Sequence, residues 1–313
     1  MTRRFLVRRV WQALIVLLAA YTVAFLLLAA LPGDAIMARY ASPELGLSPA
    51  QIEEIRVAYG ADEPVLVRYA ETLFGFLIGD FGNSLKSGAS VGALLLNAIP
   101  STLALAVCGL GAGVVVAFVL AITATYGHVR WVRRLVRSFP PVMVSLPAFW
   151  VAIILVQFFS FRLGWVPTIG ASPVEALILP TLTLAIPMGA PLAQVLIASI
   201  DEVNREDFVD VVKARGARPG WILWHNVLRN ASLPVLTMSG VLFTELVSNA
   251  VVTETVFGRT GIGSLTVEAV ASRDTPILMA IVVLAALLFV VISFLVDLAY
   301  PVIDRRIKLE EVA

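Results

Sequence analysis

The chain has 313 residues, of which 59% are hydrophobic and only 14% are charged, and its mean hydropathy is +0.91. Soluble domains usually carry about 25% charged residues, so this composition excludes one large soluble core and indicates a polytopic membrane protein. The net charge of +1 gives no sign of a nucleic-acid partner. With one cysteine, Cys108, and two distant histidines, the sequence predicts neither a disulfide framework nor a metal or cofactor site.

Six apolar segments are long enough to cross a membrane, since a helix needs about 20 residues to span ~30 Å of hydrocarbon. They are Trp11–Leu31, about Ser101–Tyr126, about Val142–Trp165, about Leu177–Ile200, about Leu233–Val256 and about Ile277–Tyr300. The first is longer than the apolar part of a cleaved signal peptide, so we expect a retained anchor. The fourth contains three prolines, which predicts a kinked helix packed inside a bundle. The expected fold is an all-α integral membrane protein with six transmembrane helices.

The basic residues predict the orientation of these spans. The segments 1–10, 127–141, 201–232 and 301–313 together hold 16 of the 23 lysines and arginines. Cytoplasmic loops carry an excess of such residues, so both termini are expected in the cytoplasm. The loop between the fourth and fifth spans is then cytoplasmic too.

The segment 32–100 is then extracytoplasmic, and it holds eight acids and four bases. Its stretch "SPAQ", Ser48–Gln51, predicts a helix N-terminus with a capping box, and that helix is expected to end near Gly60. A second amphipathic run covers about Pro64–Ile78. The segment is either a surface lid or a docking face for an extracytoplasmic partner, and the sequence leaves both open.

The cytoplasmic loop 201–232 shows helical periodicity interrupted by a turn. Phe208, Val211 and Val212 share one helical face, since they are spaced at i, i+3 and i+4. Gly216 can end that helix in a left-handed conformation, and Pro219 suits the first turn of the next. The pattern predicts helix, tight turn, helix, lying outside the bilayer.

This loop has two interpretations. It can rest on the lipid surface, with its bases facing anionic head groups. Its first ten residues, however, contain the acids Asp201, Glu202, Glu206, Asp207 and Asp210. An acidic start, a glycine turn and an aromatic second half that we expect to be buried favour a protein-docking element.

The stretch "DVVKARGARPGWILWHNVLRNASLPVLT" resembles the coupling loop of ABC importer permeases, particularly the branch that imports peptides and nickel chelates. In that branch a basic-Ala-x-Gly turn precedes a run "HxxxNxxxP", represented here by His225, Asn230 and Pro234 with one extra residue in the first interval. Where the general motif has Glu-Ala-Ala, this chain has Asp210 followed by two valines. The long interval after Gly216 fits the peptide branch better than the sugar branch.

Further blocks resemble the same branch in the same order along the chain. They are "GDFGNSL", "SLPAFW", "ETVFGRTGIGSL", "SRDTPIL" and "LVDLAYPVIDRRIK". The resemblance implies a multi-pass protein of the bacterial inner membrane with the type I ABC importer permease fold. It also implies a layout of four parts: a tail and first helix (1–31), an extracytoplasmic segment (32–100), a five-helix core (101–303) and a cytoplasmic tail (304–313).

The resemblance implies a permease subunit that forms half of a translocation pathway and is not itself an enzyme. No phosphate-binding G-x-x-x-x-G-K-[ST] motif is present, so ATP hydrolysis falls to partners. The implied partners are a second, homologous permease, two cytoplasmic ATP-binding subunits, an extracytoplasmic binding protein and the bilayer. Peptides are the preferred substrate, with nickel chelates, glutathione or another small solute as alternatives. An ion-gradient-driven transporter or a scaffold subunit are the rivals from other classes.

The resemblance also suggests roles for residues of the coupling loop. Asp210, in the place of the family's glutamate, would pair with a base on the ATPase, and Gly216 would supply the turn. The apolar anchors would be Phe208, Val212 and Trp221. Arg215 contacts either the ATPase or solvent and lipid.

The fifth span carries a polar stripe. Its members are Thr237, Gly240, Thr244 and Ser248, with Glu245 and Asn249 beside it. A charged group inside a span usually faces water or the bundle interior, so the stripe is expected to line the translocation path. The alternative is a hydrogen-bonded seam between helices. Asp297, near the end of the sixth span, is expected to pair with a nearby base such as Arg305.

Overall fold

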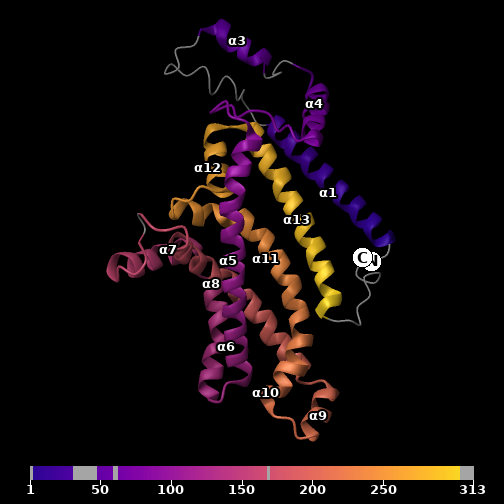
Figure 1. Ribbon diagram of the computed structural model, residues 1–313, viewed down its shortest axis with the longest axis vertical. Helices are drawn as coiled ribbons and strands as arrows, with labels where there is room; N and C mark the ends of the chain where they lie inside the picture. The colour runs from indigo at the N-terminus through magenta and orange to yellow at the C-terminus, as the bar shows by residue number, and fades with distance from the viewer. Residues whose placement is uncertain (1–2, 31–47, 59–62, 168–169, 304–313) are drawn as a thin grey trace. The chain divides into compact units, whose positions relative to one another are not determined.

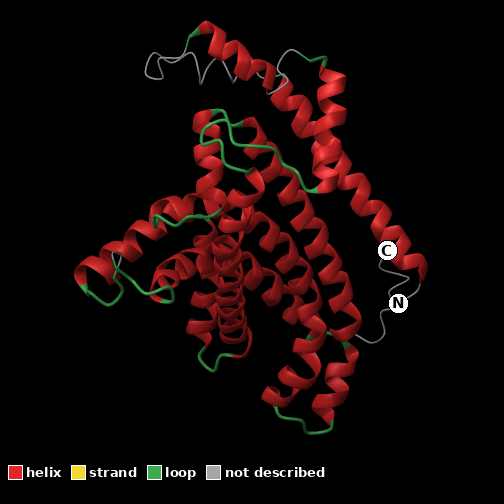
Figure 2. Ribbon diagram, turned by 45° about the horizontal axis from the view of Figure 1, so that its top comes forward, coloured by secondary structure: helices red, strands yellow, loops and turns green. Residues whose placement is uncertain are grey.

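The computed structural model describes residues 3–30, 48–58, 63–167 and 170–303. Within these ranges the chain is helical, and Figure 2 shows no strand in them. An isolated bridge between Asn83 and Ser90 closes a short loop. The all-helical prediction is therefore confirmed for the part of the chain that the structure describes.

The helices follow one another along the chain as labelled in Figure 1. They are α1 (Arg3–Ala29), α3 (Pro49–Ala58), α4 (Val65–Ile78), α5 (Val91–Tyr126), α6 (Arg130–Val144), α7 (Ala148–Leu155), the π-helical segment η2 (Val156–Arg162), α8 (Glu175–Val203), α9 (Asp207–Ala214), α10 (Pro219–Ile222), the π-helical turn η3 (Leu223–Val227), α11 (Leu228–Val256), α12 (Ile262–Ser272) and α13 (Thr275–Ile303).

The chain forms two compact units. Unit 1 comprises Met1–Arg9, Leu103–Arg259 and Val291–Ala313, and unit 2 comprises Val10–Thr102 and Thr260–Val290. Unit 1 contains α6 to α11, and unit 2 contains α3, α4 and α12. Each unit is described by itself below.

Four of the described helices are long and apolar enough to cross a membrane alone. They are Leu6–Ala29, Val91–Tyr126, Glu175–Val203 and Thr275–Pro301. Two bent pairs raise the number to six if each pair counts as one span: Arg130–Val144 with Ala148–Arg162, bent by 107°, and Pro219–Leu246 with Ala250–Val256, bent by 53°.

The predicted third span, Val142–Trp165, is wrong as a single helix. The chain breaks after Val144 and resumes as α7, with Pro147 as the extended residue before its first turn. Proline disfavours helical geometry in the residue before it and has no N–H of its own, so "SLP" ends one helix and starts the next. The amphipathic helix α6 also occupies most of a segment that the sequence suggested was a loop.

The proline-rich fourth span lies inside unit 1, as predicted. Of its most apolar stretch 56% is buried, against 17–33% in the other three long helices. Two glycines let α8 approach α5 closely: a Cβ built on Gly189 would lie 2.9 Å from the carbonyl oxygen of Gly113. The backbones of the two helices are therefore in direct contact at this crossing.

Unit 2 confirms two local predictions. The Ser48 amide donates to Gln51 Oε1 at 2.9 Å, and the Gln51 amide donates to Ser48 Oγ at 3.3 Å, which completes the capping box of α3. The run Pro64–Ile78 forms α4, with Pro64 immediately before its first residue. The predicted helix end near Gly60 lies outside the described residues.

A buried carboxylate joins two separate loops of unit 2. Asp274, at the start of α13, is fully buried, and its Oδ2 accepts hydrogen bonds from Ser84 Oγ at 2.5 Å and from the Lys86 amide at 3.2 Å. The Lys86 ammonium also lies 2.5 Å from the Glu268 carboxylate on α12. These contacts fix the loop between α4 and α5 to the corner between α12 and α13.

We expect Ser84→Ala to destabilise unit 2, because Ser84 Oγ donates to a buried charge and accepts from two backbone amides. Hydrogen bonds to charged groups contribute about 1.5–3 kcal/mol each. Thermal unfolding of the purified permease should therefore occur several degrees lower. Ser87→Ala is the matched control, since Ser87 Oγ accepts only one exposed amide bond, at 3.3 Å. Equal unfolding temperatures for the two variants would contradict the buried network.

Candidate functional site

The loop between α8 and α11, at the lower end of Figure 1, has the predicted helix–turn–helix shape. The helix α9 ends at Ala214, and Gly216 follows in the left-handed conformation with φ +82°. Arg218 is extended, and Pro219 occupies the first turn of α10. Since α10, η3 and α11 are consecutive, the second half of the loop continues directly into the fifth span.

The buried residue of α9 is Val209, which is 0% exposed. Phe208 and Val211 are 39% and 51% exposed, and Val212 is half-buried. The face proposed from the sequence is thus turned mostly outward. The sequence did not single out Val209 as the buried residue of this helix. Val209 nevertheless lies three residues before Val212, a spacing that places both on one helical face.

The second half of the loop combines a buried aliphatic side with an exposed aromatic side. Ile222, Leu223 and Val227 are buried. Trp221 and Trp224 are 49% and 61% exposed, so the expectation of a buried aromatic second half is wrong. Aliphatic side chains already fill the inner face of this short helix, and the indoles project to the surface.

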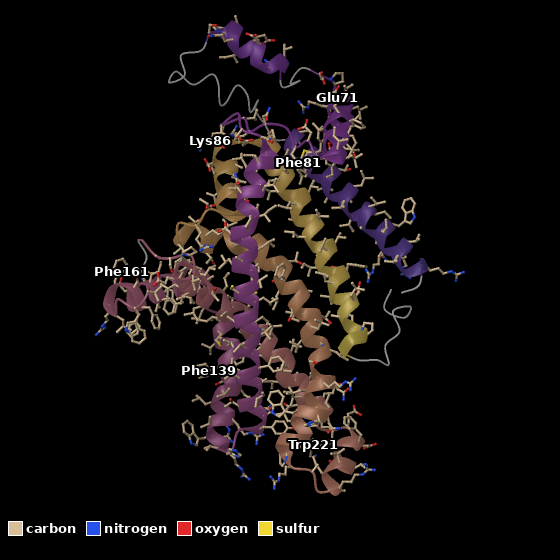
Figure 3. All side chains as sticks on the ribbon, viewed as in Figure 1. Glu71, Phe81, Lys86, Phe139, Phe161 and Trp221 are labelled. Atoms are coloured by element: carbon tan, nitrogen blue, oxygen red, sulfur yellow. The ribbon has the colours of Figure 1, made fainter. Side chains whose placement is uncertain are left out.

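Trp221 forms a local stack rather than a core contact. Its ring lies 4.7 Å from that of His225, with 12° between the planes, and His225 Nδ1 is 3.1 Å from the Trp221 carbonyl oxygen. Figure 3 places Trp221 in the region of α9 and α10, at the end of unit 1 that carries the loop. The stack holds an apolar surface in one orientation while it stays accessible.

The remaining predicted coupling residues are exposed too. Asp210 accepts a hydrogen bond from Lys213 Nζ at 2.9 Å, yet 73% of its side chain is accessible. Arg215 and Gly216 are both exposed. An exposed ion pair contributes little to the free energy of unfolding. A base on a partner can therefore replace Lys213 beside Asp210 with little loss of stability. The structure brings the six predicted coupling residues together on one compact loop.

Two side chains anchor the start of this loop to neighbouring helices. The Arg137 guanidinium on α6 donates to both oxygens of Asp201, at 2.8 and 2.9 Å. The Tyr126 hydroxyl at the end of α5 donates to Asn204 Oδ1 at 2.7 Å. Asp201, interpreted from the sequence as one of the docking acids, is therefore engaged inside unit 1. The sequence offered no signal for these pairs, because they join distant segments.

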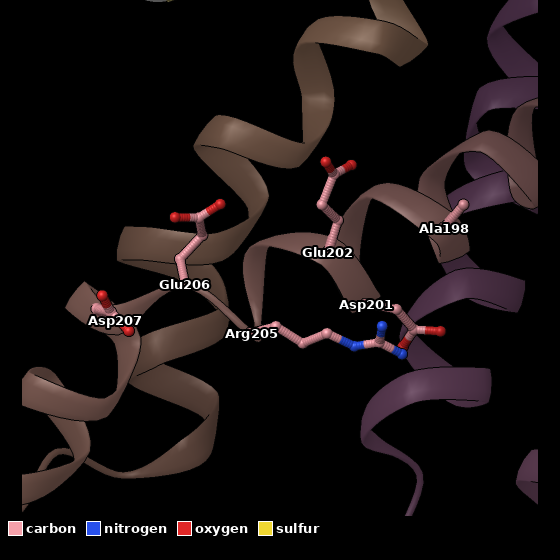
Figure 4. Close-up of a pocket in the computed structure, with 6 residues that line it drawn as sticks. All are labelled: Ala198, Asp201, Glu202, Arg205, Glu206 and Asp207. Carbon is pink, nitrogen blue, oxygen red and sulfur yellow. The ribbon is translucent and has the colours of Figure 1, made fainter.

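A shallow hollow of about 370 Å³ lies at the same place, shown in Figure 4. It is lined by Ala198, Asp201, Glu202, Arg205, Glu206 and Asp207. Four of these residues carry carboxylates and one carries a guanidinium, so the local charge is negative. The acidic character inferred from the sequence is thus present on the folded loop.

The polar stripe of α11 faces α13 over its first part. The hydroxyls of Thr237 and Tyr300 are hydrogen-bonded to each other. A Cβ on Gly240 would approach Val296 Cγ2 to 2.6 Å, so the two helices are in close contact there. At these two positions the stripe is a seam between helices of the same chain.

The later part of the stripe is different. Thr244 is half-buried, its hydroxyl donates to the Gly240 carbonyl at 3.2 Å, and Glu245 is exposed. The side chains of Ser248 and Asn249 lie outside the described part of the chain. Any contact of this stripe with substrate stays a prediction.

Asp297 forms an ion pair with Arg9. It is 7% exposed and lies on the half of α13 that belongs to unit 1. A buried carboxylate needs a charged partner, and the N-terminal helix supplies it. The expected partner Arg305 lies outside the described residues, so that pairing stays a prediction.

Residues 109–309 match the family described as "Binding-protein-dependent transport system inner membrane component", and residues 1–106 match the N-terminal region of such components. The chain belongs to this family. The match covers most of the sequence and confirms the resemblance drawn from the motifs. It also makes the chain a multi-pass component of the inner membrane.

Relatives of similar length support the assignment. A probable peptide ABC transporter permease, y4tP of Sinorhizobium fredii, is 34% identical over 97% of this chain and 99% of its own. A putative peptide transport system permease of Brucella abortus is 32% identical over 97% and 98%. The glutathione transport system permease GsiC of Escherichia coli is 33% identical over 97% and 98%.

Solved structures confirm the fold class. The MetNI methionine ABC transporter in an inward-facing conformation superposes with a TM-score of 0.54 at 20% identity, over 67% of this chain and 96% of that chain. An amino acid ABC transporter gives 0.52 at 16% identity, over 69% and 94%. At these identities the likeness concerns the fold alone, which is that of ABC importer permeases.

Proposed function

We propose that this chain forms one half of the membrane pathway of an ATP-driven importer of short peptides. The observation that carries the proposal is its similarity, over nearly the full length, to permeases named for peptide transport. The exposed helix–turn–helix loop between α8 and α11 supports it, because such a loop provides a site for an ATPase. The other half would be a second, homologous permease.

In this proposal both termini lie in the cytoplasm and six spans cross the membrane, each bent pair counting as one. Two ATP-binding subunits dock on the loop 201–232, and a binding protein delivers the peptide from the other side. The segment 32–100 is extracytoplasmic, and the core 101–303 forms the pathway. The excess of basic residues in the four inner segments supports this orientation.

The coupling would be mechanical. Exposed Phe208 and Trp221 would sit in a groove of the ATPase, and Asp210 would pair with one of its bases. When the groove closes on ATP, the loop would move as a rigid body. The Arg137–Asp201 and Tyr126–Asn204 contacts supply a path for that motion into α6 and α5.

Glutathione is the second candidate substrate. GsiC, named for glutathione transport, is 33% identical to this chain, almost the same value as the first peptide relative. Glutathione is itself a small peptide, so the same pathway would suit both. Nickel chelates carry their own metal ligands and would need no ligand set in the permease.

The proposal is tested by purifying the complex with its ATPases and binding protein and placing it in liposomes. We expect di- to oligopeptides to stimulate ATP hydrolysis and to accumulate inside the liposomes in an ATP-dependent way. Glutathione and a nickel chelate are tested in parallel under the same conditions. Stimulation by glutathione alone would favour the second candidate, and uptake driven by an ion gradient without ATP would overturn both.

A further inference from the structure

An arginine occupies a backbone position that normally belongs to glycine. Arg273 directly follows α12 and has φ 53° and ψ 38°, in the left-handed region. In the described part of the chain it is the one residue other than glycine with a positive φ. The Cβ of an L-residue is disfavoured there, and arginine lacks the short polar side chain with which asparagine bonds to its own backbone. Arg273 therefore holds a conformation that costs free energy.

The same turn ends other helices of this chain, and there it contains glycine. In the turn, one amide bonds to the carbonyl three residues back and the next amide to the carbonyl five residues back, which is the pattern of a Schellman motif. The residues at its left-handed position are Gly79 after α4, Gly216 after α9, Gly258 after α11 and Arg273 after α12. The fold thus requires a left-handed residue at the end of α12, but it does not require an arginine.

The surrounding contacts hold Arg273 in this conformation. The Arg273 and Asp274 amides bond to carbonyls of the last turn of α12 at 3.2 and 2.8 Å. The buried Asp274 carboxylate is fixed in turn by Ser84 Oγ and by the Lys86 amide. Strained residues persist where neighbouring contacts over-determine their geometry, and they cluster at functional sites. The backbone that carries Arg273 is therefore a rigid corner of unit 2.

The side chain of Arg273 is exposed, and the structure gives its guanidinium no hydrogen bond or ion pair with a described residue. The helix dipole favours a cation at the end of α12, but it does so throughout the last turn, without a left-handed backbone. The Glu268 carbonyl of that turn accepts from Ser272 Oγ at 2.7 Å instead. The cation Lys86, labelled in Figure 3, is paired with Glu268. The Arg273 guanidinium is thus available to a group outside the described chain.

The chemistry of the guanidinium limits what this group can be. Its planar fork of donors matches a carboxylate or a phosphate through paired hydrogen bonds. Phospholipid head groups are mobile, so an arginine on any surface backbone reaches them equally well. A carboxylate on a folded partner has a set position, and a rigid arginine meets it with a smaller loss of entropy. The corner also carries both signs of charge, in Lys86 and Glu268, which favours a protein partner over a uniformly anionic membrane surface.

We propose that Arg273 is a docking residue for a carboxylate on the extracytoplasmic binding protein. This inference rests on the proposed function, because the orientation given there places the corner between α12 and α13 on the extracytoplasmic side. The corner leads directly into α13, which starts at Thr275. A binding protein that docks on Arg273 therefore contacts the permease where its last long helix begins.

Two substitutions separate the charge of Arg273 from its backbone strain. Arg273→Ala removes the guanidinium and keeps the strained Cβ, whereas Arg273→Gly removes both. In the liposome-reconstituted complex, the binding protein is loaded with the di- or oligopeptide that stimulates the unaltered permease. We expect both variants to raise the concentration of binding protein that gives half-maximal ATP hydrolysis about threefold or more, because an intermolecular charge pair is lost. Arg273→Lys, which keeps the charge, should lie between. Arg273→Gly should unfold at the same temperature as the unaltered permease or higher.

Arg162→Ala is the matched control. Arg162 ends η2, is also exposed without a described partner, and has no positive φ, so its loss should leave the half-maximal concentration unchanged. Equal values for Arg162→Ala and Arg273→Ala would overturn the inference. A lower unfolding temperature of Arg273→Gly would do so too, since it would indicate a structural role.

The lipid composition distinguishes the remaining source of an anion. An effect of Arg273→Ala that occurs in liposomes with phosphatidylglycerol but not in pure phosphatidylcholine would assign the guanidinium to lipid and overturn the inference. A complex with unaltered Arg273 that its binding protein fails to stimulate would instead contradict the proposed function itself. The two failures are therefore distinguished by the unaltered complex alone.

Discussion

Gly216→Val is expected to reduce ATP-dependent uptake and substrate-stimulated ATP hydrolysis at least about tenfold in the assembled importer. Gly216 has φ +82°, and a β-branched residue there costs roughly 1–3 kcal/mol of backbone strain. A Cβ at this position meets nothing within 4 Å, so the strain is local and the spans should fold normally. The amount of permease in the membrane should be unchanged while the coupling of ATPase to transport is lost.

Two variants act as controls for this result. Gly220 lies on α10, lacks a positive φ and also has open space around a Cβ, so Gly220→Val should leave uptake nearly unchanged. Asparagine tolerates the left-handed conformation, so Gly216→Asn should retain most activity. Equal activities for Gly216→Val and Gly220→Val would show that the turn geometry has no part in coupling.

The features of this loop that the sequence predicted depend on neighbouring residues. Gly216 before Pro219 predicts a helix end and a new helix start, and both are found. The capping box of Ser48 and Gln51 was predicted on the same basis, since both of its hydrogen bonds close within four residues. Such local patterns predict the structure correctly because contacts with distant parts of the chain have little influence on them.

The features that the sequence did not predict depend on distant partners. The sequence suggests a partner for Asp297 that is close along the chain, but the ion pair in the structure joins it to Arg9, near the other end of the chain. Asp201 was interpreted as a docking acid because nothing in the sequence reveals that Arg137 lies beside it. Local charge patterns identify which residues need a partner, and only the packing of helices decides which partner they find.

The stripe on α11 shows the same limit for the pathway. Thr237 and Gly240 share a helical face whether they line a pathway or a seam, and the periodicity is identical in both cases. The structure places Tyr300 and Val296 of α13 against them, which favours the seam at these positions. Glu245, which is exposed, remains the charged candidate for the pathway.

Gly113→Val is expected to abolish assembly of the permease. A Cβ on Gly113 would lie 2.8 Å from Met188 Cβ and 3.1 Å from the Gly189 amide nitrogen, so α5 and α8 would have to separate. Backbone atoms cannot move away as a flexible side chain can, and overpacking typically costs about 1–3 kcal/mol, occasionally more. Because α8 is the most buried of the four long helices, its displacement affects all of unit 1.

The matched control lies two residues away on the same helix. A Cβ on Gly111 meets nothing within 4 Å, so Gly111→Val changes the composition of α5 identically without touching α8. We expect size-exclusion chromatography of detergent extracts to recover assembled complex from Gly111→Val and almost none from Gly113→Val. Gly113→Ala should be intermediate, because one methyl group still meets Met188. Equal recovery of the two valine variants would mean that the helices can separate at little cost, and that close contact at Gly113 and Gly189 does not hold unit 1 together.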